Sequence, residues 1–328
     1  MNIAIQKGDL LKPGSAFSRR VWDHGDGLYH VLLVLCVIAV LGLVIAIGYE
    51  LWQYSALARR AFGWKFLITT DWDPAIENTF GALPFIFGTL ITSTIALLGA
   101  VPLSMGTAIF LSELAPNWLR QPVGFLVELL AAVPSVVYGL WGLFVYIPAF
   151  VKPTAQILNR ELGFLPLFAG PIYGPSRLAA GLLLAIMIFP TIAAVSRDVL
   201  RSIPDSQREA SLAMGATHWE MIWQVLLPYG ASGFLGAIIL GLGRALGETI
   251  AVTMVIGNNL DLSLSVLHPG YTMASVIANE FTEATTDIYL NALIEIGLIL
   301  FGITLLINLI ARFLIWRMSK SVKGEVRL

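Results

Sequence analysis

Two residues of opposite charge stand four positions apart inside a long apolar stretch of this chain. They are Arg244 and Glu248, in the sequence GLGRALGETIAVTMVIGN. A charge at the centre of a membrane-spanning helix costs about 2.5–3.5 kcal/mol on insertion scales, so each side chain should face protein or water. Because residues four apart lie on one face of a helix, we expect these two side chains to form an ion pair.

This expected pair has two interpretations, and the sequence alone leaves both open. In the first, the pair is structural and fixes its helix against the rest of a helix bundle. In the second, which we favour, the pair lines a passage, and an incoming anion replaces Glu248 as the partner of Arg244. Such binding is weak enough to allow release, as conduction demands. Gly241, Gly243 and Gly247 would let a neighbouring helix or a substrate approach this face.

A second group of residues with informative spacing lies in the loop 202–228, SIPDSQREASLAMGATHWEMIWQVLLP. It contains two capping boxes, in which a hydroxyl caps a backbone N–H and a carboxylate three residues later reaches back. The two pairs are Ser206 with Glu209 and Thr217 with Glu220. Gly215 lies between them, where a left-handed helix terminus favours glycine. The pattern predicts a helix, a sharp turn and a second helix.

The predicted helix pair also carries a small apolar surface. Its residues are Ala210, Leu212, Ala213 and Met214. One interpretation is that the loop is an ordered connection with no further role. The other, which we favour, is that this surface seats in a groove of another protein, because amphipathic helices bind in this way.

The composition shows which elements must position these residues. The chain has 57% hydrophobic and only 12% charged residues, and its mean hydropathy is +0.80. A soluble domain carries about a quarter charged residues, so this is a membrane protein. Its single cysteine, Cys36, excludes a disulfide framework and a thiolate metal cluster. No GxxxxGK[ST], HExxH or GxSxG motif occurs, so we expect no enzyme activity in this chain and no cofactor.

Apolar stretches of about 20 residues predict an all-α polytopic membrane protein. Six such stretches occur, near 29–50, within 78–112, and near 122–150, 178–197, 226–256 and 288–316. The second is too long for one straight span and too short for two, so Pro102 and Gly106 predict a kinked or tilted helix. The predicted division is a cytoplasmic segment 1–28, a first transmembrane helix 29–52, an external loop 53–77, a five-helix core 78–316 and a cytoplasmic tail 317–328.

The distribution of basic residues predicts the orientation of these spans. Thirteen Lys and Arg residues fall on the side of the two termini and the loop 202–228, against six on the other side. Since Lys and Arg are enriched in cytoplasmic loops, we expect both termini and this loop to lie in the cytoplasm.

The loop 202–228 resembles the EAA signature of ABC importer permeases, roughly E-A-A, three residues, G, nine residues and I-x-L-P. The matching positions are Glu209, Ala210, Ser211, Gly215, Ile222, Leu227 and Pro228. Serine replaces the second alanine, and the isoleucine lies early. The resemblance implies a type I ABC importer fold in which Glu209, Ala210 and Gly215 couple the chain to separate ATPase subunits.

The strings RALGET and TMVIGN add a resemblance to the membrane subunits of phosphate-specific importers, closer to the PstC-type chains than to the PstA-type chains. It implies that Arg244 and Glu248 serve phosphate passage and that the loop 151–177 helps to receive a periplasmic phosphate-binding protein. It also implies a heterodimer with a second permease subunit, two ATPase subunits and a bacterial inner membrane. The alternatives are the sister subunit, a permease for sulfate or molybdate, and an autonomous ion-coupled carrier or channel.

Overall fold

The computed structural model describes residues 24–325, so most of the predicted cytoplasmic segment 1–28 lies outside the described residues. Within that range the chain is helical, and its only extended pairs are two isolated bridges, Asp73 with Thr79 and Gly257 with Gly270. Six helical stretches are long and apolar enough to cross a membrane, which confirms the all-α, six-span prediction. They are Tyr29–Tyr54, Leu83–Leu114, Ser135–Leu162, Arg177–Ser202, His218–Gly247 and Asp287–Arg317.

The chain divides into two compact units, residues 1–50 and 51–328. The described part of the first unit belongs to helix α1 (His24–Tyr54), which begins before the predicted first span and ends after it. Its sequence is apolar on all faces, as expected of a helix surrounded by lipid. A helix thus covers the region of the first predicted span.

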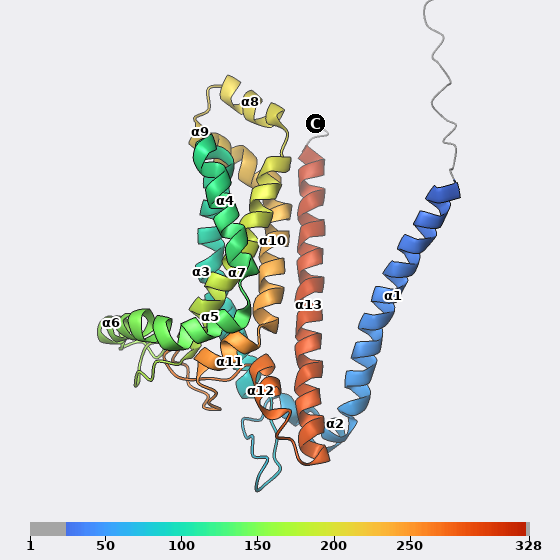
Figure 1. Cartoon of the computed structure of the whole chain (residues 1–328), viewed down its shortest axis with the longest axis vertical. Coiled ribbons are helices and arrows are strands. Elements are labelled where there is room, and N and C mark those ends of the chain that lie inside the picture. The colour runs from blue at the N-terminus through green and yellow to red at the C-terminus, as the bar shows by residue number, and fades with distance from the viewer. Residues whose placement is uncertain (1–23, 326–328) are drawn as a thin grey trace, which may run out of the picture. The chain divides into compact units, whose positions relative to one another are not determined.

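The second unit is a bundle centred on helix α7 (Arg177–Ser202), the most buried of the six spans. It packs against α3 (Leu83–Ile109) and α10 (Leu227–Gly247), as Figure 1 shows. A Cβ added at Gly181 of α7 would lie only 2.6 Å from the Cβ of Ile95 in α3. This glycine therefore permits the close approach of the two helices, as small residues do in membrane bundles.

The second predicted span is a single long helix, as expected. Helix α3 contains Pro102 and continues into a π-helical turn, η2 (Phe110–Leu114). The last span, α13 (Asp287–Glu325), is also continuous and packs against α10 and α12 (Met273–Glu280).

The third and fifth predicted spans are wrong in one respect, because each is interrupted. The stretch 122–150 contains α4 (Asn117–Ala132), a break, then α5 (Ser135–Trp141). Val133 has an extended ψ of 127°, which follows from Pro134, since a residue that precedes proline avoids the helical region. Helix α5 continues through π-helical η3 (Gly142–Val151) into α6 (Lys152–Leu162), so the first part of the predicted outer loop 151–177 is helical.

The second interruption lies beside Arg244. Helix α10 ends at Gly247, and Glu248 has a ψ of 123°. A separate helix, α11 (Ile250–Ile256), follows. Glycine is a weak helix former, so Gly243 and Gly247 make this end of α10 easy to interrupt. The stretch 226–256 is therefore two helices.

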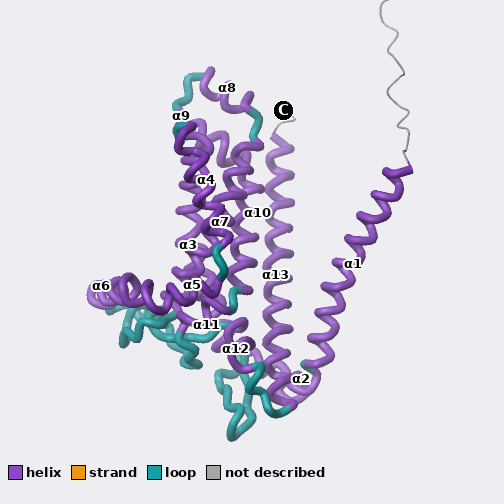
Figure 2. The backbone as a smooth tube through the Cα atoms, in the orientation of Figure 1, coloured by secondary structure: helices purple, strands orange, loops and turns teal. Residues whose placement is uncertain are grey.

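The two ends of the bundle differ in structure. At one end lie α8 (Asp205–Ala213), α9 (His218–Met221) and the carboxyl end of α13, with η4 (Ile222–Leu226) leading from α9 into α10 (Figure 1). At the other end lie α12, α2 (Ala56–Phe62), η1 (Gly63–Leu67) and most of the loops, drawn teal in Figure 2.

An aromatic cluster stabilises the loop-rich end. The indole N–H of Trp72 donates to Glu280 at 2.8 Å, and the hydroxyl of Tyr289 donates to the same carboxylate at 2.7 Å. The ring of Trp72 also meets the rings of Phe80 and Phe85 edge to face, each with centroids 4.9 Å apart. These contacts join residues that are far apart in the sequence.

Candidate functional site

The loop 202–228 forms the predicted helix, turn and helix. Helix α9 has the expected capping box, in which the amide of Thr217 donates to Glu220 at 2.8 Å and the amide of Glu220 donates to the Thr217 hydroxyl at 3.3 Å. Gly215 has a φ of +90°, the left-handed conformation expected of it. A Cβ at this position would meet nothing within 4 Å, so the backbone conformation rather than space favours glycine.

The capping box predicted at Ser206 is wrong. Helix α8 begins at Asp205 after Pro204, and no side chain caps it. Because proline presets the backbone at the start of a helix, the helix begins before Ser206, which lies inside the first turn. Glu209 is exposed and makes no capping contact.

The apolar surface predicted on this segment is exposed. Met214 is 84% exposed and Leu212 is 38% exposed, and Ala210 and Ala213 are exposed with them. An exposed apolar patch on a rigid element is typical of a protein interaction site. Glu209 and Ala210 lie in α8, and Gly215 lies in the turn that joins α8 to α9. We call α8 and this turn the projecting segment, because α8 lies at the end of the bundle (Figure 1).

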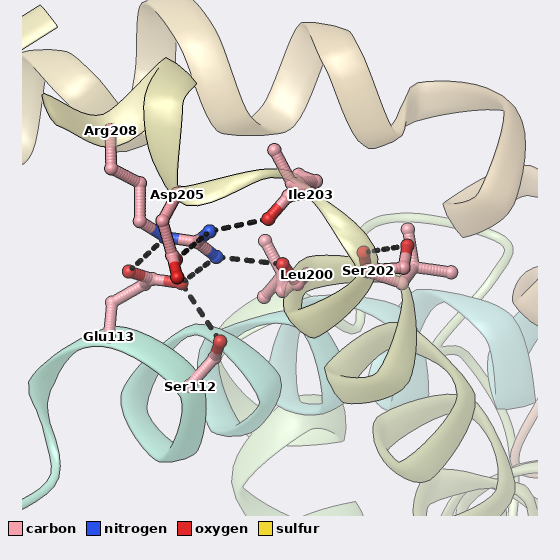
Figure 3. A network of polar contacts seen from close by, with 8 residues as sticks. Ser112, Glu113, Leu200, Ser202, Ile203, Asp205 and Arg208 are labelled. Carbon is pink, nitrogen blue, oxygen red and sulfur yellow. Dashed lines mark hydrogen bonds and ion pairs between the residues drawn. The ribbon is translucent and has the colours of Figure 1, made fainter. Parts of the chain in front are cut away.

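Arg208 anchors this projecting segment to the bundle (Figure 3). Its guanidinium donates to the Glu113 carboxylate at 2.9 and 3.2 Å, and also to the carbonyls of Ile203 at 2.7 Å and Leu200 at 2.8 Å. Asp205 accepts a further bond at 3.2 Å. The hydrogen bond with Glu113 raises the pKa of Arg208, so its guanidinium is charged at any physiological pH.

Sequence reasoning missed this anchor. Glu113 lies in η2 at the end of α3, and its side chain is only 9% exposed. Each residue stood at a noticeable position in the sequence. Glu113 is the first acidic residue after the long uncharged stretch, and Arg208 directly precedes the EAA-like residues. Nothing in the spacing joined two positions 95 residues apart.

The structure does not form the predicted pair between Arg244 and Glu248. None of the ion pairs within residues 24–325 joins these two side chains. Arg244 instead donates to the hydroxyl of Thr191 in α7 at 3.1 Å, and Glu248 accepts from the amide of Ala251 at 3.3 Å. The prediction assumed a continuous helix, and Glu248 has already left it.

Arg244 lies partly buried next to the interruption of the fifth span. A guanidinium has five N–H donors, and only the bond to Thr191 engages Arg244 within the described residues. The remaining donors are available to an anion. The environment is suited to this, because interrupted helices at membrane depth line cavities or substrate sites in transporters.

The interrupted helices contact each other directly. A Cβ at Gly139 of α5 would lie 2.5 Å from the sulfur of Met254 in α11 and 3.2 Å from the Cα of Ala251. Across the first break, the hydroxyl of Tyr138 donates to the carbonyl of Leu130 at 2.9 Å. This bond satisfies a carbonyl at the end of α4 that has no helical donor, since residue 134 is proline and has no N–H.

Arg177 is a second buried arginine whose structural role sequence reasoning missed. It is only 2% exposed, and its guanidinium donates to the carbonyls of Ser263 at 2.7 Å, Ser265 at 3.2 Å and Asp261. One side chain therefore holds the loop that follows α11 at the loop-rich end of the bundle. Its position at the edge of a predicted span gave no sign of this role.

The chain matches one family model over residues 100–320, that of the binding-protein-dependent transport system inner membrane component. Several relatives carry the name phosphate transport system permease protein PstC. The one from Pasteurella multocida is 51% identical over 79% of this chain and 82% of its own length. The one from Xylella fastidiosa strain 9a5c is 44% identical over 90% of this chain and 92% of its own length.

Solved structures show the same fold at low sequence identity. A chain of a bacterial alginate ABC transporter in complex with its periplasmic protein is 18% identical, with a TM-score of 0.61. That match covers 92% of this chain and 99% of the other. A chain of the MetNI methionine ABC transporter in an inward-facing conformation is 17% identical, with a TM-score of 0.53 over 71% of this chain and 93% of the other.

Proposed function

The chain belongs to the family of binding-protein-dependent inner membrane permeases, in its PstC branch, and on this premise we propose that its cargo is inorganic phosphate. It is a multi-pass inner membrane protein and a transport subunit of an ABC importer. Membership in this family implies an ATPase and a substrate-binding protein as partners. The names of the relatives support phosphate, because identities of 44–51% extend over most of both chains.

The main support for the proposed passage is the hydrogen bonding of Arg244. Its guanidinium has one hydrogen-bond partner within the described residues and lies beside the interruption at Glu248. An oxyanion that reaches this point gains several charge-assisted hydrogen bonds. Glu248, bound to α11 through Ala251, supplies nearby negative charge that favours release. Phosphate is thus held briefly and then passed on.

The projecting segment supplies the proposed coupling to ATP hydrolysis. Glu209, Ala210 and Gly215 would contact an ATPase subunit, and closure of two such subunits would pull on α8. The bonds from Arg208 to Glu113 then carry this movement to α3. Since α3 packs along α7, whose Thr191 binds Arg244, the movement reaches the proposed passage.

The remaining partners follow from the same proposal. We place both termini and α8 in the cytoplasm, where the excess of Lys and Arg lies. A sister permease would complete a heterodimer and close the passage from its second side. The loop-rich end, including the loop held by Arg177, would then face the periplasm and receive the phosphate-binding protein.

Phosphate uptake by the assembled complex in proteoliposomes tests this function. We expect Arg244→Gln to lower ATP-driven uptake at least ten-fold while the complex still assembles. The matched control is Arg317→Gln, because Arg317 is exposed and lies outside the loop 151–177 and the loop 202–228. Normal uptake by an assembled Arg244→Gln complex would exclude a role in the passage.

The anion that stimulates ATP hydrolysis distinguishes phosphate from other oxyanions as the cargo. ATPase activity of the complex should rise with the phosphate-loaded binding protein and not respond to sulfate or molybdate. A complex that transports sulfate as efficiently as phosphate would contradict the proposed cargo.

A further inference from the structure

Three arginines line one cavity between α4 and α7, on the same half of the bundle as α8. They are Arg120, Arg197 and Arg201. The cavity has a volume of about 350 Å³, whereas a water molecule occupies about 30 Å³ of the liquid. It is therefore large enough for a group several times the size of water. None of these three residues belongs to the proposed passage at Arg244.

The cavity carries excess positive charge. Its lining contains one carboxylate, that of Glu128, which accepts from Arg197 at 3.0 Å. Asp198 lies beyond it, 3.7 Å from the Nε of Arg197. The side chain of Arg197 is 13% exposed, whereas those of Glu128 and Asp198 are 57% and 68% exposed. Water therefore screens the two acids more than it screens the buried arginine.

Two donors at this cavity lack acceptors. The Nε atoms of Arg120 and Arg197 are both buried and have no hydrogen-bond partner among residues 24–325. In that part of the chain the single hydrogen bond of Arg120 runs from its Nη2 to the carbonyl of Ala115 at 3.3 Å. A buried donor without an acceptor is costly, so native proteins rarely retain one unless a ligand, ion or water completes the site. An oxyanion has acceptors enough to bind several arginines at once.

Gly124 gives the cavity its shape. A Cβ at Gly124 would lie only 2.7 Å from the Nη1 of Arg197, so the guanidinium rests directly against the backbone of α4. Phe125, which is 60% exposed, adds an apolar wall. A basic pocket with an apolar border between transmembrane helices is typical of sites for anionic head groups.

From these observations we propose that Arg120, Arg197 and Arg201 form a binding site for a phosphate-type oxyanion. The shared chemistry is a phosphate group that several guanidinium donors bind at once. It has two sources, the head group of an anionic phospholipid and free inorganic phosphate. The site adjoins the projecting segment on two sides. Ala115, which accepts from Arg120, lies two residues after Glu113. Arg201 lies two residues before Ile203, whose carbonyl accepts from Arg208. Occupancy would thus hold α4 against α7 where α8 joins the bundle.

The experiment uses the assembled complex with Arg244→Gln as its background, so that the proposed passage contributes little to phosphate binding. The test variants are Arg201→Gln, which removes an exposed charge, and Gly124→Val, which displaces Arg197. Arg160→Gln is the control for the loss of one surface charge. All are reconstituted in nanodiscs of phosphatidylcholine alone or with phosphatidylglycerol added.

Two measurements separate the sources. Native mass spectrometry counts retained phosphatidylglycerol, and equilibrium binding of radiolabelled inorganic phosphate is measured in the neutral nanodiscs. We expect one of the two signals to fall about ten-fold in Arg201→Gln and in Gly124→Val, relative to Arg160→Gln, since a charge-assisted hydrogen bond contributes about 1.5–3 kcal/mol. Loss of retained lipid identifies a head-group site, and loss of phosphate binding identifies a site for the free anion.

Equal retention of lipid and equal phosphate binding in all variants would overturn the proposal. Arg120→Gln provides a second measure if Gly124→Val fails to assemble, because it removes one unpaired Nε without adding volume. Lipid retention and phosphate binding are both measured without transport. The test therefore remains interpretable even if the complex proves not to transport phosphate.

Discussion

The guanidinium of Arg208 binds both oxygens of the Glu113 carboxylate, at 2.9 and 3.2 Å, and so joins α8 to the end of α3. Both side chains are largely buried, with 17% and 9% of their surfaces exposed. Two parallel bonds fix the orientation of the partners as well as their distance. The projecting segment is therefore a rigid extension of the bundle, suited to receive movement and to transmit it.

Replacing Arg208 with lysine should uncouple transport from ATP hydrolysis. Lysine keeps the charge but has no planar fork, so it loses the bidentate contact and the bonds to Ile203 and Leu200. We expect a loss of stability of about 1–3 kcal/mol and a several-fold lower ratio of phosphate imported to ATP hydrolysed. The thermal midpoint and that ratio are measured with the Arg317→Lys complex as control, because Arg317 is exposed and lies outside the loops 151–177 and 202–228. An unchanged ratio would contradict the transmission role.

A double-mutant cycle tests whether Arg208 and Glu113 act as one unit. Glu113→Gln and Arg208→Gln should each destabilise the complex, and the double variant should lose less than the sum of the two. Chemical denaturation monitored by tryptophan fluorescence gives the three values. Simple additivity would mean that the contact contributes nothing of its own.

Gly215→Val should block coupling without unfolding the bundle. The φ of +90° is strained for any residue with a Cβ, at a cost of about 1–2 kcal/mol, and most of all for a β-branched one. There is space for the side chain, so the effect falls on the turn between α8 and α9. Phosphate uptake should fall at least ten-fold with normal assembly. Gly215→Asn is the matched variant, because asparagine tolerates this conformation and should retain most uptake.

Thr191→Val should lower the maximal rate of uptake more than it changes the KM for the phosphate-loaded binding protein. The substitution keeps the shape of the side chain but removes the single hydrogen-bond partner of Arg244 within the described residues. We expect the maximal rate to fall about three- to ten-fold, the equivalent of one lost hydrogen bond. Initial uptake rates over a range of concentrations of the loaded binding protein measure this. Identical kinetics would show that Thr191 does not position the guanidinium.

Arg177→Met should release the loop that follows α11. Three carbonyl oxygens lose the guanidinium donor, those of Ser263, Ser265 and Asp261. Asp261 and Ser265 each keep one backbone N–H donor, whereas Ser263 keeps none within the described residues. The expected loss of stability is about 1–3 kcal/mol, with faster proteolysis at this loop. Limited proteolysis followed by mass spectrometry locates the cleavage sites. Cleavage equal to that of the unmodified complex would show that other contacts hold the loop.

Apolar run length was sufficient to predict the number of spans, because a membrane sets the length of a helix. The capping chemistry of Thr217 and the left-handed Gly215 were likewise local and were confirmed. Predictions failed where a proline overrode another local pattern, either a capping motif or a run of apolar residues. Pro204 started α8 before Ser206, and Pro134 divided an apolar stretch that hydropathy alone treats as one span.

The contacts that define the site were beyond sequence reasoning for a different reason. Arg244 was identified from its membrane depth, but its partner Thr191 lies 53 residues earlier, on another helix. The anchor between Arg208 and Glu113 and the arginines of the cavity also come from separate helices. The pattern of one sequence does not show which faces of two separate helices pack together. These contacts therefore became visible only in the packed structure.

The breaks at Val133 and Glu248 separate α4 from α5 and α10 from α11. A continuous helix tilts as a whole, so a displacement at its α8 end would also shift its opposite end. Because helical backbone bonding stops at both breaks, α4 and α10 can change their angle to α5 and α11, which remain in contact through Gly139. A movement that begins at α8 therefore need not extend to the loop-rich end of the bundle.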